Sequence, residues 1–480
     1  VAINNAVYSD GVSDGQSTAP TGNDIIDGGE GDNKIAGEAQ AIADDAEAVA
    51  QNTAAGEDVE AGNDKINAHD GDDQISGDAQ ALGKDNAVSK AFNTVVGIGE
   101  EDANRSSAGN DYIVAGEGDN EVAGDSQAIS EYGEASAYGE NTAGDGGSDD
   151  VNRAGSDTIF GSLLGDDVLS GGAQAIAAKD AFAKQQNHAG GEDSADDDNE
   201  AGNDVIQGYE GDNVVAGDAQ AIGEDHFSFA TAQSHNHSEA DDNGDGADNA
   251  AGDDRIYTGD DDDKAAGDAQ AIAGKSADAW STNKALGYGN TAGNDRIEVG
   301  HGHNKVAGDA QAIAGLKAWA YGTNTAGDGD GDRDNTAGND TIVSGNASDK
   351  VSGGAQALAG LFAHADQVNE AGAGGDDELG NSAGNDDIDV SGGHNRAAGD
   401  AQAISSLGVA QAYSANEAGA EGSFGGNAAG NDTIESGNGR DTVSGDAQAI
   451  AKIHALSVSS IVVGGDEDNR AGNDSINAGN

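Results

Sequence analysis

The sequence predicts an all-β fold, a parallel β-solenoid of about ten repeats that carries acidic loops of variable length. The main observation is a recurring phrase, A-G-N-D-x-I-x-x-G-x-G-D-N-x-V-A-G-D-A-Q-A-I-A, whose first clear copy runs from Gly22 to Ala43. Ten steps and 450 residues separate Gly22 from Gly472, so the mean period is 45 residues. Aromatic residues make up only 4% of the chain and 78 residues are glycine, which excludes an ordinary globular core.

Each repeat begins with two turns that lie nine residues apart. Gly22-Asn23-Asp24 and Gly31-Asp32-Asn33 both open a G-x-[D/N]-x-apolar pattern. Glycine permits the positive φ of a tight turn, and we expect the single apolar residue of each pattern to point into a thin core. Ile26 and Ile35 therefore begin two expected columns of stacked apolar side chains.

An alanine-rich strand pair is expected after the two turns. Ala39-Gln40-Ala41-Ile42-Ala43 alternates with a period of two, and a second alternation, such as Ala181-Phe182-Ala183, follows it. Alanine also favours helices, so a short helix is the rival interpretation. The preceding glycines and the β-branched version from Ile453 to Val463 favour strands. Each repeat then ends in an acidic loop, for example 189–200 or 238–249, which we expect to be a solvated insertion.

The repeat also defines the expected domain organisation. Residues 1–21 are the tail end of a partial repeat, residues 22–471 form the tandem repeats, and residues 472–480 start a further one. Because the chain begins with Val1 and ends at Asn480 within a turn, we expect a processed product or a part of a longer chain.

The net charge of −69 is the strongest constraint on partners. It excludes nucleic acid as a partner, and no apolar run is long enough to span a membrane. Stacked coils lie about 4.8 Å apart, so uncompensated carboxylate columns would repel one another strongly. Cations are therefore expected, and Ca²⁺ is favoured because it prefers oxygen ligands. The absence of cysteine leaves the redox compartment open.

The G-x-D-x-apolar pattern resembles the hemolysin-type calcium-binding repeat, the RTX β-roll. The resemblance covers the two turns of each repeat, although alanine usually replaces the preceding glycine. It implies a β-roll-like array in which turn aspartates and carbonyls bind Ca²⁺ between successive turns. The rival interpretation is a plain Asx-turn without metal. Carried over residue by residue, the resemblance gives the following metal ligands in the first turns: Asp24, Asp64, Asp111, Asp157, Asp204, Asp254, Asp295, Asp340, Asp386, Asp432 and Asp474. In the second turns it gives Asp32, Asn33, Asp72, Asp73, Asp119, Asn120, Asp166, Asp167, Asp212, Asn213, Asp262, Asp263, Asn304, Asp349, Asn395 and Asp441.

Three further columns recur beside the strands. An acidic residue precedes the alanine strand in most repeats, with Gly172 and Gly354 as exceptions, and is either a second calcium ligand or an exposed residue at the strand start. We call it the strand-start column: Glu38, Asp78, Asp125, Asp218, Asp268, Asp309, Asp400 and Asp446. A glutamine column predicts an amide ladder between coils: Gln40, Gln80, Gln127, Gln174, Gln220, Gln270, Gln311, Gln356, Gln402 and Gln448. A second ladder is expected at Asn52, Asn93, Asn141, Asn187, Asn324, Asn369 and Asn416.

No residue set predicts catalysis. His301, His303 and His394 replace acidic turn residues, and we interpret them as solvated turn residues rather than transition-metal ligands. No serine or cysteine nucleophile has a recurring histidine partner, and the carboxylates are too regular to single out a glycosidase pair. We therefore predict that the protein is not an enzyme.

The leading functional hypothesis is a calcium-stabilised extracellular structural protein that builds a fibre or a biofilm matrix filament. Head-to-tail self-association would satisfy the unpaired strands at the ends of an uncapped solenoid. The alternative is the rigid extender of a calcium-dependent cell-surface adhesin, and contact with polysaccharide or a cell surface is a further candidate. An ice-binding solenoid is disfavoured, because that class has a regular row of threonines before G-N-D and this chain has threonine there only at Thr21. A polysaccharide lyase is disfavoured because uniform repeats leave no distinctive cleft.

Overall fold

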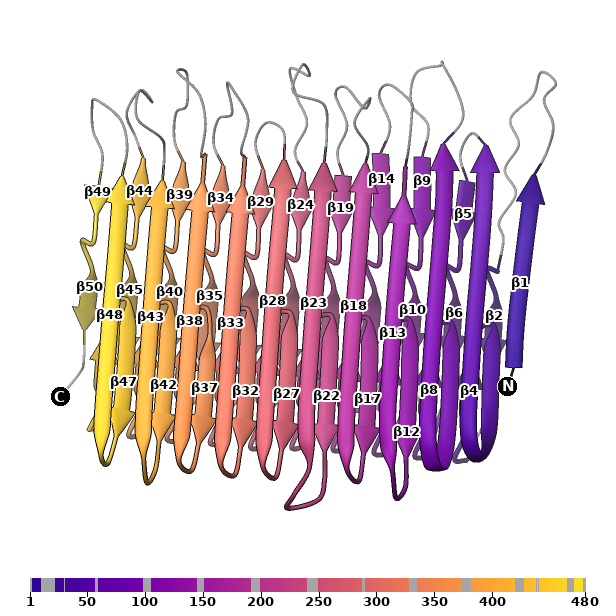
Figure 1. The fold of residues 1–480 in the computed structure, drawn as a ribbon, viewed down its shortest axis with the longest axis horizontal. Coiled ribbons are helices and arrows are strands. Elements are labelled where there is room, and N and C mark those ends of the chain that lie inside the picture. Colours follow the sequence, from indigo (N-terminus) through magenta and orange to yellow (C-terminus); the bar gives the residue numbers. More distant parts are fainter. Residues whose placement is uncertain are drawn as a thin grey trace.

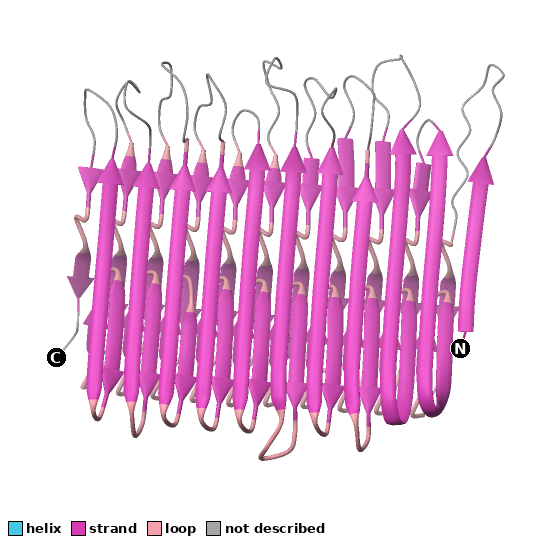
Figure 2. Ribbon diagram, in the orientation of Figure 1, coloured by secondary structure: helices cyan, strands magenta, loops and turns pink. Residues whose placement is uncertain are grey.

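The computed structural model shows a parallel β-solenoid whose coils stack side by side along one axis (Figure 1). Strands β1 (Ala2–Ser9) and β50 (Ser475–Asn477) lie at opposite ends of the stack. The structure describes residues 2–9, 22–29, 31–56, 59–97, 105–144, 151–190, 199–239, 249–286, 290–327, 335–372, 381–418, 427–436, 438, 440–463 and 470–477. These ranges contain strands and turns and no helix (Figure 2), which confirms the all-β prediction.

One coil from the middle of the stack illustrates the architecture. Its strands are β24 (Ala250–Ala251), β25 (Arg255–Thr258), β26 (Lys264–Ala266), β27 (Ala269–Ala273) and β28 (Ser276–Leu286). The first turn lies between β24 and β25, and the second turn between β25 and β26. Each strand pairs in parallel with its counterpart in the next coil, so the stack contains one sheet of 19 strands, one of 11 and two of 10.

Residues of the same repeat position lie beside each other from coil to coil. Ile256 pairs with Ile297, and Gln270 pairs with Gln311. A shift of the strand pairing by one residue would turn every side chain to the other face of the sheet. The repetition of the same residue types in each coil therefore fixes this register. Differences in repeat length are absorbed mainly by the acidic loops, most of whose residues lie outside the described ranges.

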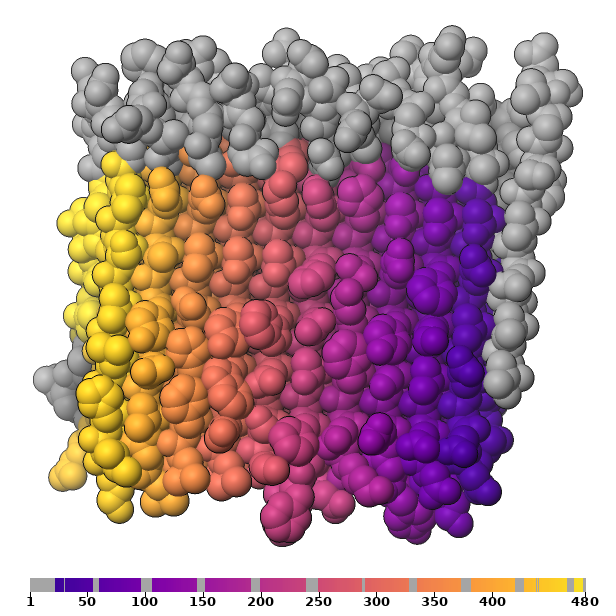
Figure 3. Space-filling view, in the orientation of Figure 1, coloured from indigo at the N-terminus to yellow at the C-terminus, as the bar shows by residue number. Residues whose placement is uncertain are grey.

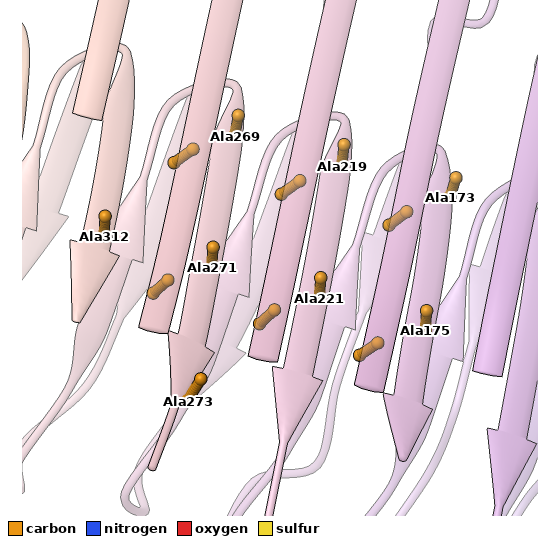
Figure 4. Close-up of a cluster of buried hydrophobic side chains, with 14 of the residues drawn as sticks. Ala173, Ala175, Ala219, Ala221, Ala269, Ala271, Ala273 and Ala312 are labelled. Carbon is orange, nitrogen blue, oxygen red and sulfur yellow. The ribbon is translucent and has the colours of Figure 1, made fainter. Parts of the chain in front are cut away.

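The alanine-rich segments form two facing strand layers rather than helices. The alternate alanines of β27 and its neighbours point toward those of β28 and its neighbours (Figure 4), and they form one continuous buried cluster. Small side chains allow this close approach of two sheets. In β4 (Ala39–Gly56) and β8 (Ala79–Gly97) one strand runs through both layers. The outward face of the long strands carries rows of side chains that cross the coils (Figure 3).

Two more apolar cores complete the cross-section. The isoleucine and valine columns of the two turn patterns face each other, as Ile256 and Ala265 do in the coil described above. They are fully buried in the middle of the stack and partly exposed at its ends, as at Ile26 and Val443. Small alanine clusters join the far end of the long strands to the short strands such as β24. The space between these three cores, next to the first turn, is lined by polar side chains.

Both ends of the described chain continue the same pairing. Strand β1 pairs with β4, from Ala2 beside Ala48 to Ser9 beside Ala55. Strand β50 pairs with β45 (Thr433–Ser436). The division of the chain at residues 21 and 472 stays a prediction.

Candidate metal centre

The first turn of each coil places one aspartate inside the solenoid. Gly252, at a φ of 66°, opens the turn, and Asp254 follows two residues later with no exposed surface. The backbone N–H of Asp204 donates to Asp254 Oδ1 at 2.6 Å, and the N–H of Asp254 donates to Asp295 Oδ1 at 2.8 Å. We number the coils 1 to 11 after these residues, the first-turn column: Asp24, Asp64, Asp111, Asp157, Asp204, Asp254, Asp295, Asp340, Asp386, Asp432 and Asp474.

The second carboxylate oxygen of this column has no hydrogen-bond partner. The Oδ2 atoms of coils 2 to 10 are all buried and unpaired. Asp254 Oδ2 occupies space beside Gly217, where an added Cβ would lie 1.7 Å away, so only glycine fits there. A buried, ionised oxygen without a donor is costly unless a cation neutralises it. The aspartates at the ends of the stack, Asp24 and Asp474, are exposed.

The strand-start column faces the first-turn column across this interior space. Asp218, Asp268 and Asp309 have no exposed surface. The interpretation of these residues as exposed strand starts is therefore wrong, because the bend before the alanine strand turns them inward. Their hydrogen bonds come from the asparagine ladder: Asn283 Nδ2 donates to Asp268 Oδ2 at 2.9 Å, and Asn236 Nδ2 donates to Asp218 Oδ2 at 2.7 Å.

The two facing columns, together called the inner column, bring three carboxylates together at five places among the residues that the structure describes. In each place one oxygen from every residue lies within 4.8 Å of the others. Four of the five sets combine the strand-start residues of two successive coils with the first-turn residue of the second coil. The sets are Asp24, Glu38 and Asp64; Asp78, Asp111 and Asp125; Asp218, Asp254 and Asp268; Asp268, Asp295 and Asp309; Asp400, Asp432 and Asp446.

Burial and mutual repulsion disfavour the ionised form of these groups. Burial, followed by the charges of Asp204 and Asp218, holds the pKa of Asp254 well above its usual range. Burial raises the pKa of Asp309 to about 7, although hydrogen bonds from Asn324 and Gln367 lower it in part. Without a cation the inner column would therefore bind protons at neutral pH.

The donor set of the inner column fits Ca²⁺. Calcium takes six to eight oxygen ligands at about 2.3–2.6 Å, so oxygens around one ion lie up to about 5 Å apart. The clusters provide three carboxylates within 4.8 Å, and the unpaired Oδ2 atoms are available to an ion. The side chains that would hold Ca²⁺ are those of the five sets. Bound Ca²⁺ would neutralise their charge and link one coil to the next.

The second turn is built differently, although its motif is the same. Its buried position alternates strictly between Asn and Asp in coils 1 to 10, from Asn33 and Asp73 to Asn395 and Asp441. Asn213 N–H donates to Asp263 Oδ1 at 3.0 Å, and Asp263 N–H donates to Asn304 Oδ1 at 3.0 Å. Within the described ranges, none of the three-carboxylate sets includes a second-turn residue.

The remaining second-turn aspartates form an exposed ladder. Asp212 N–H donates to Asp166 Oδ1, and Asp262 N–H donates to Asp212 Oδ1, both at 2.8 Å. His303 joins the same ladder, since its N–H donates to Asp262 Oδ1 and its Nδ1 accepts from the N–H of Ser348 at 3.1 Å. The histidines are turn residues, as interpreted from the sequence. The exposed second-turn members of the predicted set are Asp32, Asp72, Asp119, Asp166, Asp212 and Asp262.

Both predicted amide ladders are present, and the asparagine ladder is longer than predicted. Each glutamine from Gln40 to Gln402 donates from Nε2 to Oε1 of the next, at 2.7–3.2 Å. The asparagine ladder from Asn52 to Asn416 includes Asn236 and Asn283, which the sequence analysis missed. A third ladder, also missed, joins Asn152, Asn199, Asn249, Asn290 and Asn335.

Comparison with known proteins supports the assignment from the turns. The model of the RTX calcium-binding nonapeptide repeat family matches residues 21–41, 58–81, 105–128, 153–175, 200–221, 250–271, 334–357 and 428–449. The chain contains RTX calcium-binding nonapeptide repeats. It is therefore a calcium-binding repeat protein, and the carboxylates of its interior are the candidate ion sites. No curated protein and no solved structure matched the chain.

The matched segments run through both turns and reach the alanine strand. The segment 200–221, for example, includes Asp204, Asn213, Asp218 and Gln220. RTX repeats are typical of secreted proteins. Across the described part of the chain, no helix has the length and apolar character needed to cross a membrane.

Proposed function

We propose that this protein is a calcium-stabilised extracellular structural protein that assembles into a fibre or matrix filament and has no enzymatic activity. The observation that carries the proposal is the uniformity of the coil-to-coil contacts. The same backbone ladders and glutamine bonds recur along the stack, from Gln40 to Gln448. Ten steps of about 4.8 Å give a rod of about 48 Å.

Assembly is supported by the edges of the rod. Strand β48 (His454–Val463) pairs with β43 (Val409–Ala418) on one side. Among the described residues no strand pairs with its other edge, and open strand edges pair readily with another strand. A second copy stacked in the same register would extend the same ladders and give an open filament.

An extracellular location is supported by the calcium requirement and by the typical occurrence of RTX repeats in secreted proteins. Calcium-binding modules outside cells work at about 10⁻⁴–10⁻³ M, and weak sites of that kind fill only where calcium is abundant. Order in the solenoid would then depend on export.

Electron microscopy of the purified full chain in millimolar CaCl₂ and in EDTA tests the proposal. We expect filaments that are much longer than one chain in calcium and that dissociate in EDTA. Separate rods of one chain length at every protein concentration would contradict the filament proposal and support the adhesin extender. Contact with polysaccharide or a cell surface is tested by co-sedimentation of the calcium-loaded protein.

A further inference from the structure

The strand-start column is interrupted at two coils, and both interruptions are filled in the same way. Gly172 in coil 4 and Gly354 in coil 8 replace the acidic residue. A buried glutamine of the facing long strand, Gln185 or Gln367, occurs thirteen residues later in the same coil. The other coils have alanine, glycine or serine at the glutamine position. Glycine at the strand start and glutamine on the facing strand occur together in two coils, which indicates that the glutamine compensates for the missing acidic residue.

The glutamine carboxamide occupies the space of the missing aspartate. A Cβ added to Gly172 would lie 2.4 Å from Gln185 Cδ, and one added to Gly354 would lie 2.4 Å from Gln367 Cδ. The preceding coil also has glycine where the amide passes over it. A Cβ at Gly139 would lie 1.9 Å from Gln185 Oε1. Likewise, a Cβ added to Gly322 would lie 2.0 Å from Gln367 Oε1.

Each glutamine donates to the last strand-start aspartate before the interruption. Gln185 Nε2 donates to Asp125 Oδ2 at 2.6 Å, and Gln367 Nε2 donates to Asp309 Oδ2 at 2.7 Å. In coils 5, 6 and 9 a serine hydroxyl donates instead, as Ser281 Oγ does to Asp268 Oδ2 at 2.8 Å. The amide N–H therefore meets a carboxylate where a cation would otherwise neutralise it.

The three-carboxylate sets follow these interruptions. They occur in coils 1 to 3, 5 to 7 and 9 to 10, and within the described ranges none spans coils 3 to 5 or 7 to 9. In each set from coil 2 onward the first-turn aspartate, for example Asp254, is at least nine-tenths buried and has an unpaired Oδ2. The same unpaired Oδ2 occurs in four first-turn aspartates outside the sets, Asp157, Asp204, Asp340 and Asp386. This oxygen therefore marks the first-turn column of coils 2 to 10 as available to a ligand, and the strand-start carboxylates determine which coils hold a three-carboxylate set.

We propose that the inner column binds divalent cations of the calcium type in three separate blocks, with Gln185 and Gln367 replacing the cation at the block boundaries. Strand-start aspartates are ligands in this assignment, together with the turn aspartates. A coil inside a block, such as coil 6, adds two buried carboxylates, Asp254 and Asp268, and one Ca²⁺ balances their charge. The boundaries prevent an unbroken row of divalent ions at the coil spacing of about 4.8 Å.

A transplanted boundary tests this proposal, which rests on the calcium binding that underlies the proposed function. The variant Ser234→Gly/Asp268→Gly/Ser281→Gln copies Gly139, Gly172 and Gln185 into coils 5 and 6. Asp268 belongs to two of the sets, so we expect the variant to bind two fewer Ca²⁺ per chain than the parent. Bound calcium is counted by mass spectrometry of metals after equilibrium dialysis, and circular dichroism verifies folding.

The reverse variant keeps the test decisive if the transplant fails to fold. Gly172→Asp/Gln185→Ser removes the boundary at coil 4 and should add two Ca²⁺, one on each side of that coil. Asp263→Asn, in the second turn, is the matched control and should leave the count unchanged. An unchanged count in the folded variants would overturn the proposal, because the glutamine oxygen would then serve as a ligand. A parent chain that binds no calcium would overturn the proposed function as well.

Discussion

The first and second turns of each coil share one motif nine residues apart but have different chemistry. Asp254 faces the strand-start aspartates, and its Oδ2 has no partner. Asp263 alternates with asparagines along its column, and its Oδ2 accepts from Thr258 Oγ1 at 2.8 Å. Three other aspartates of the same column have an unpaired Oδ2, namely Asp73, Asp349 and Asp441. Within the described ranges, however, no second-turn residue belongs to a three-carboxylate set. The turn motif therefore positions a carboxylate, and the residue that faces it decides whether an ion is needed. The following predictions test this contrast.

Calcium removal should have the largest effect. With the inner column uncompensated, EDTA at pH 7.5 should weaken the β-type circular dichroism signal and strongly lower the melting temperature, and millimolar Ca²⁺ should restore both. Each site contributes about 2.7 kcal/mol when calcium is about 100-fold above its Kd. A chelated sample with an unchanged melting temperature would show that the inner column is stable without ions.

The pH dependence of the calcium-free chain should be opposite to that of most proteins. Burial raises the pKa of Asp218 to about 6 and that of Asp400 to about 7, against about 3.9 in the unfolded chain. The folded state thus binds more protons between these values, and its stability falls as pH rises through this window.

Thermal melting in EDTA from pH 4.5 to pH 8 measures this effect. We expect the melting temperature to fall across the range, whereas calcium should raise it most at pH 8, where the carboxylates are free of protons. A calcium-free chain that melts higher at pH 8 than at pH 5 would contradict the assigned repulsion.

A matched pair of substitutions compares the two turns within one coil. Asp254→Asn removes a charge from the inner column and keeps the acceptor for the N–H of Asp204. In calcium it should lose one ion and about 2.7 kcal/mol if calcium is about 100-fold above its Kd. In EDTA it should stabilise the fold, because it relieves repulsion.

Asp263→Asn is the control, since the amide oxygen can still accept from the N–H of Asn213 and the amide nitrogen can donate to Thr258 Oγ1 in place of the present bond. It should leave the number of bound Ca²⁺ per chain unchanged and alter the free energy of unfolding only slightly. Differential scanning calorimetry with calcium titration measures both variants. Equal effects of the two substitutions would remove the distinction between the turns.

The glutamine ladder should give the smallest effect and one that is independent of calcium. Gln220 accepts from Gln174 at 3.0 Å and donates to Gln270 at 3.1 Å. Gln220→Leu would leave Gln270 Oε1 without its donor, whereas Gln174 Nε2 would keep its bonds to two backbone carbonyls, those of Val122 and Val168. The loss should cost about 1–3 kcal/mol. The calcium count should stay the same, and a lost ion would show that the ladder also orients the ion sites.

The sequence was sufficient for the register and for the glutamine ladder, although it missed two members of the second ladder, Asn236 and Asn283, and the whole third asparagine ladder. Parallel register follows from the repetition of Ile256 and Gln270 in each coil, and the amide ladder follows from the register. The facing of Asp254 and Asp268 could not be predicted, because it depends on how the chain bends between two strands. For the same reason the sequence could not decide whether the strand-start residues are calcium ligands or exposed residues.

The boundary residues were hidden for a related reason. Gln185 fills the space of the aspartate that is missing at Gly172, and it does so from a different strand, thirteen residues away. It also requires Gly139 in the preceding coil. Each position looks unremarkable in its own column. The signal that could have found them is the simultaneous appearance of glycine and glutamine in coils 4 and 8.

The most direct test is to locate the ions in crystals of the full chain grown with Ca²⁺, using anomalous scattering. Our account predicts peaks inside the solenoid, between the first-turn and strand-start carboxylates, in coils 1 to 3, 5 to 7 and 9 to 10. No peaks should lie along the buried Asn and Asp of the second turn. Peaks along the second turns, with an empty inner column, would contradict the claim that facing carboxylate columns define the calcium sites.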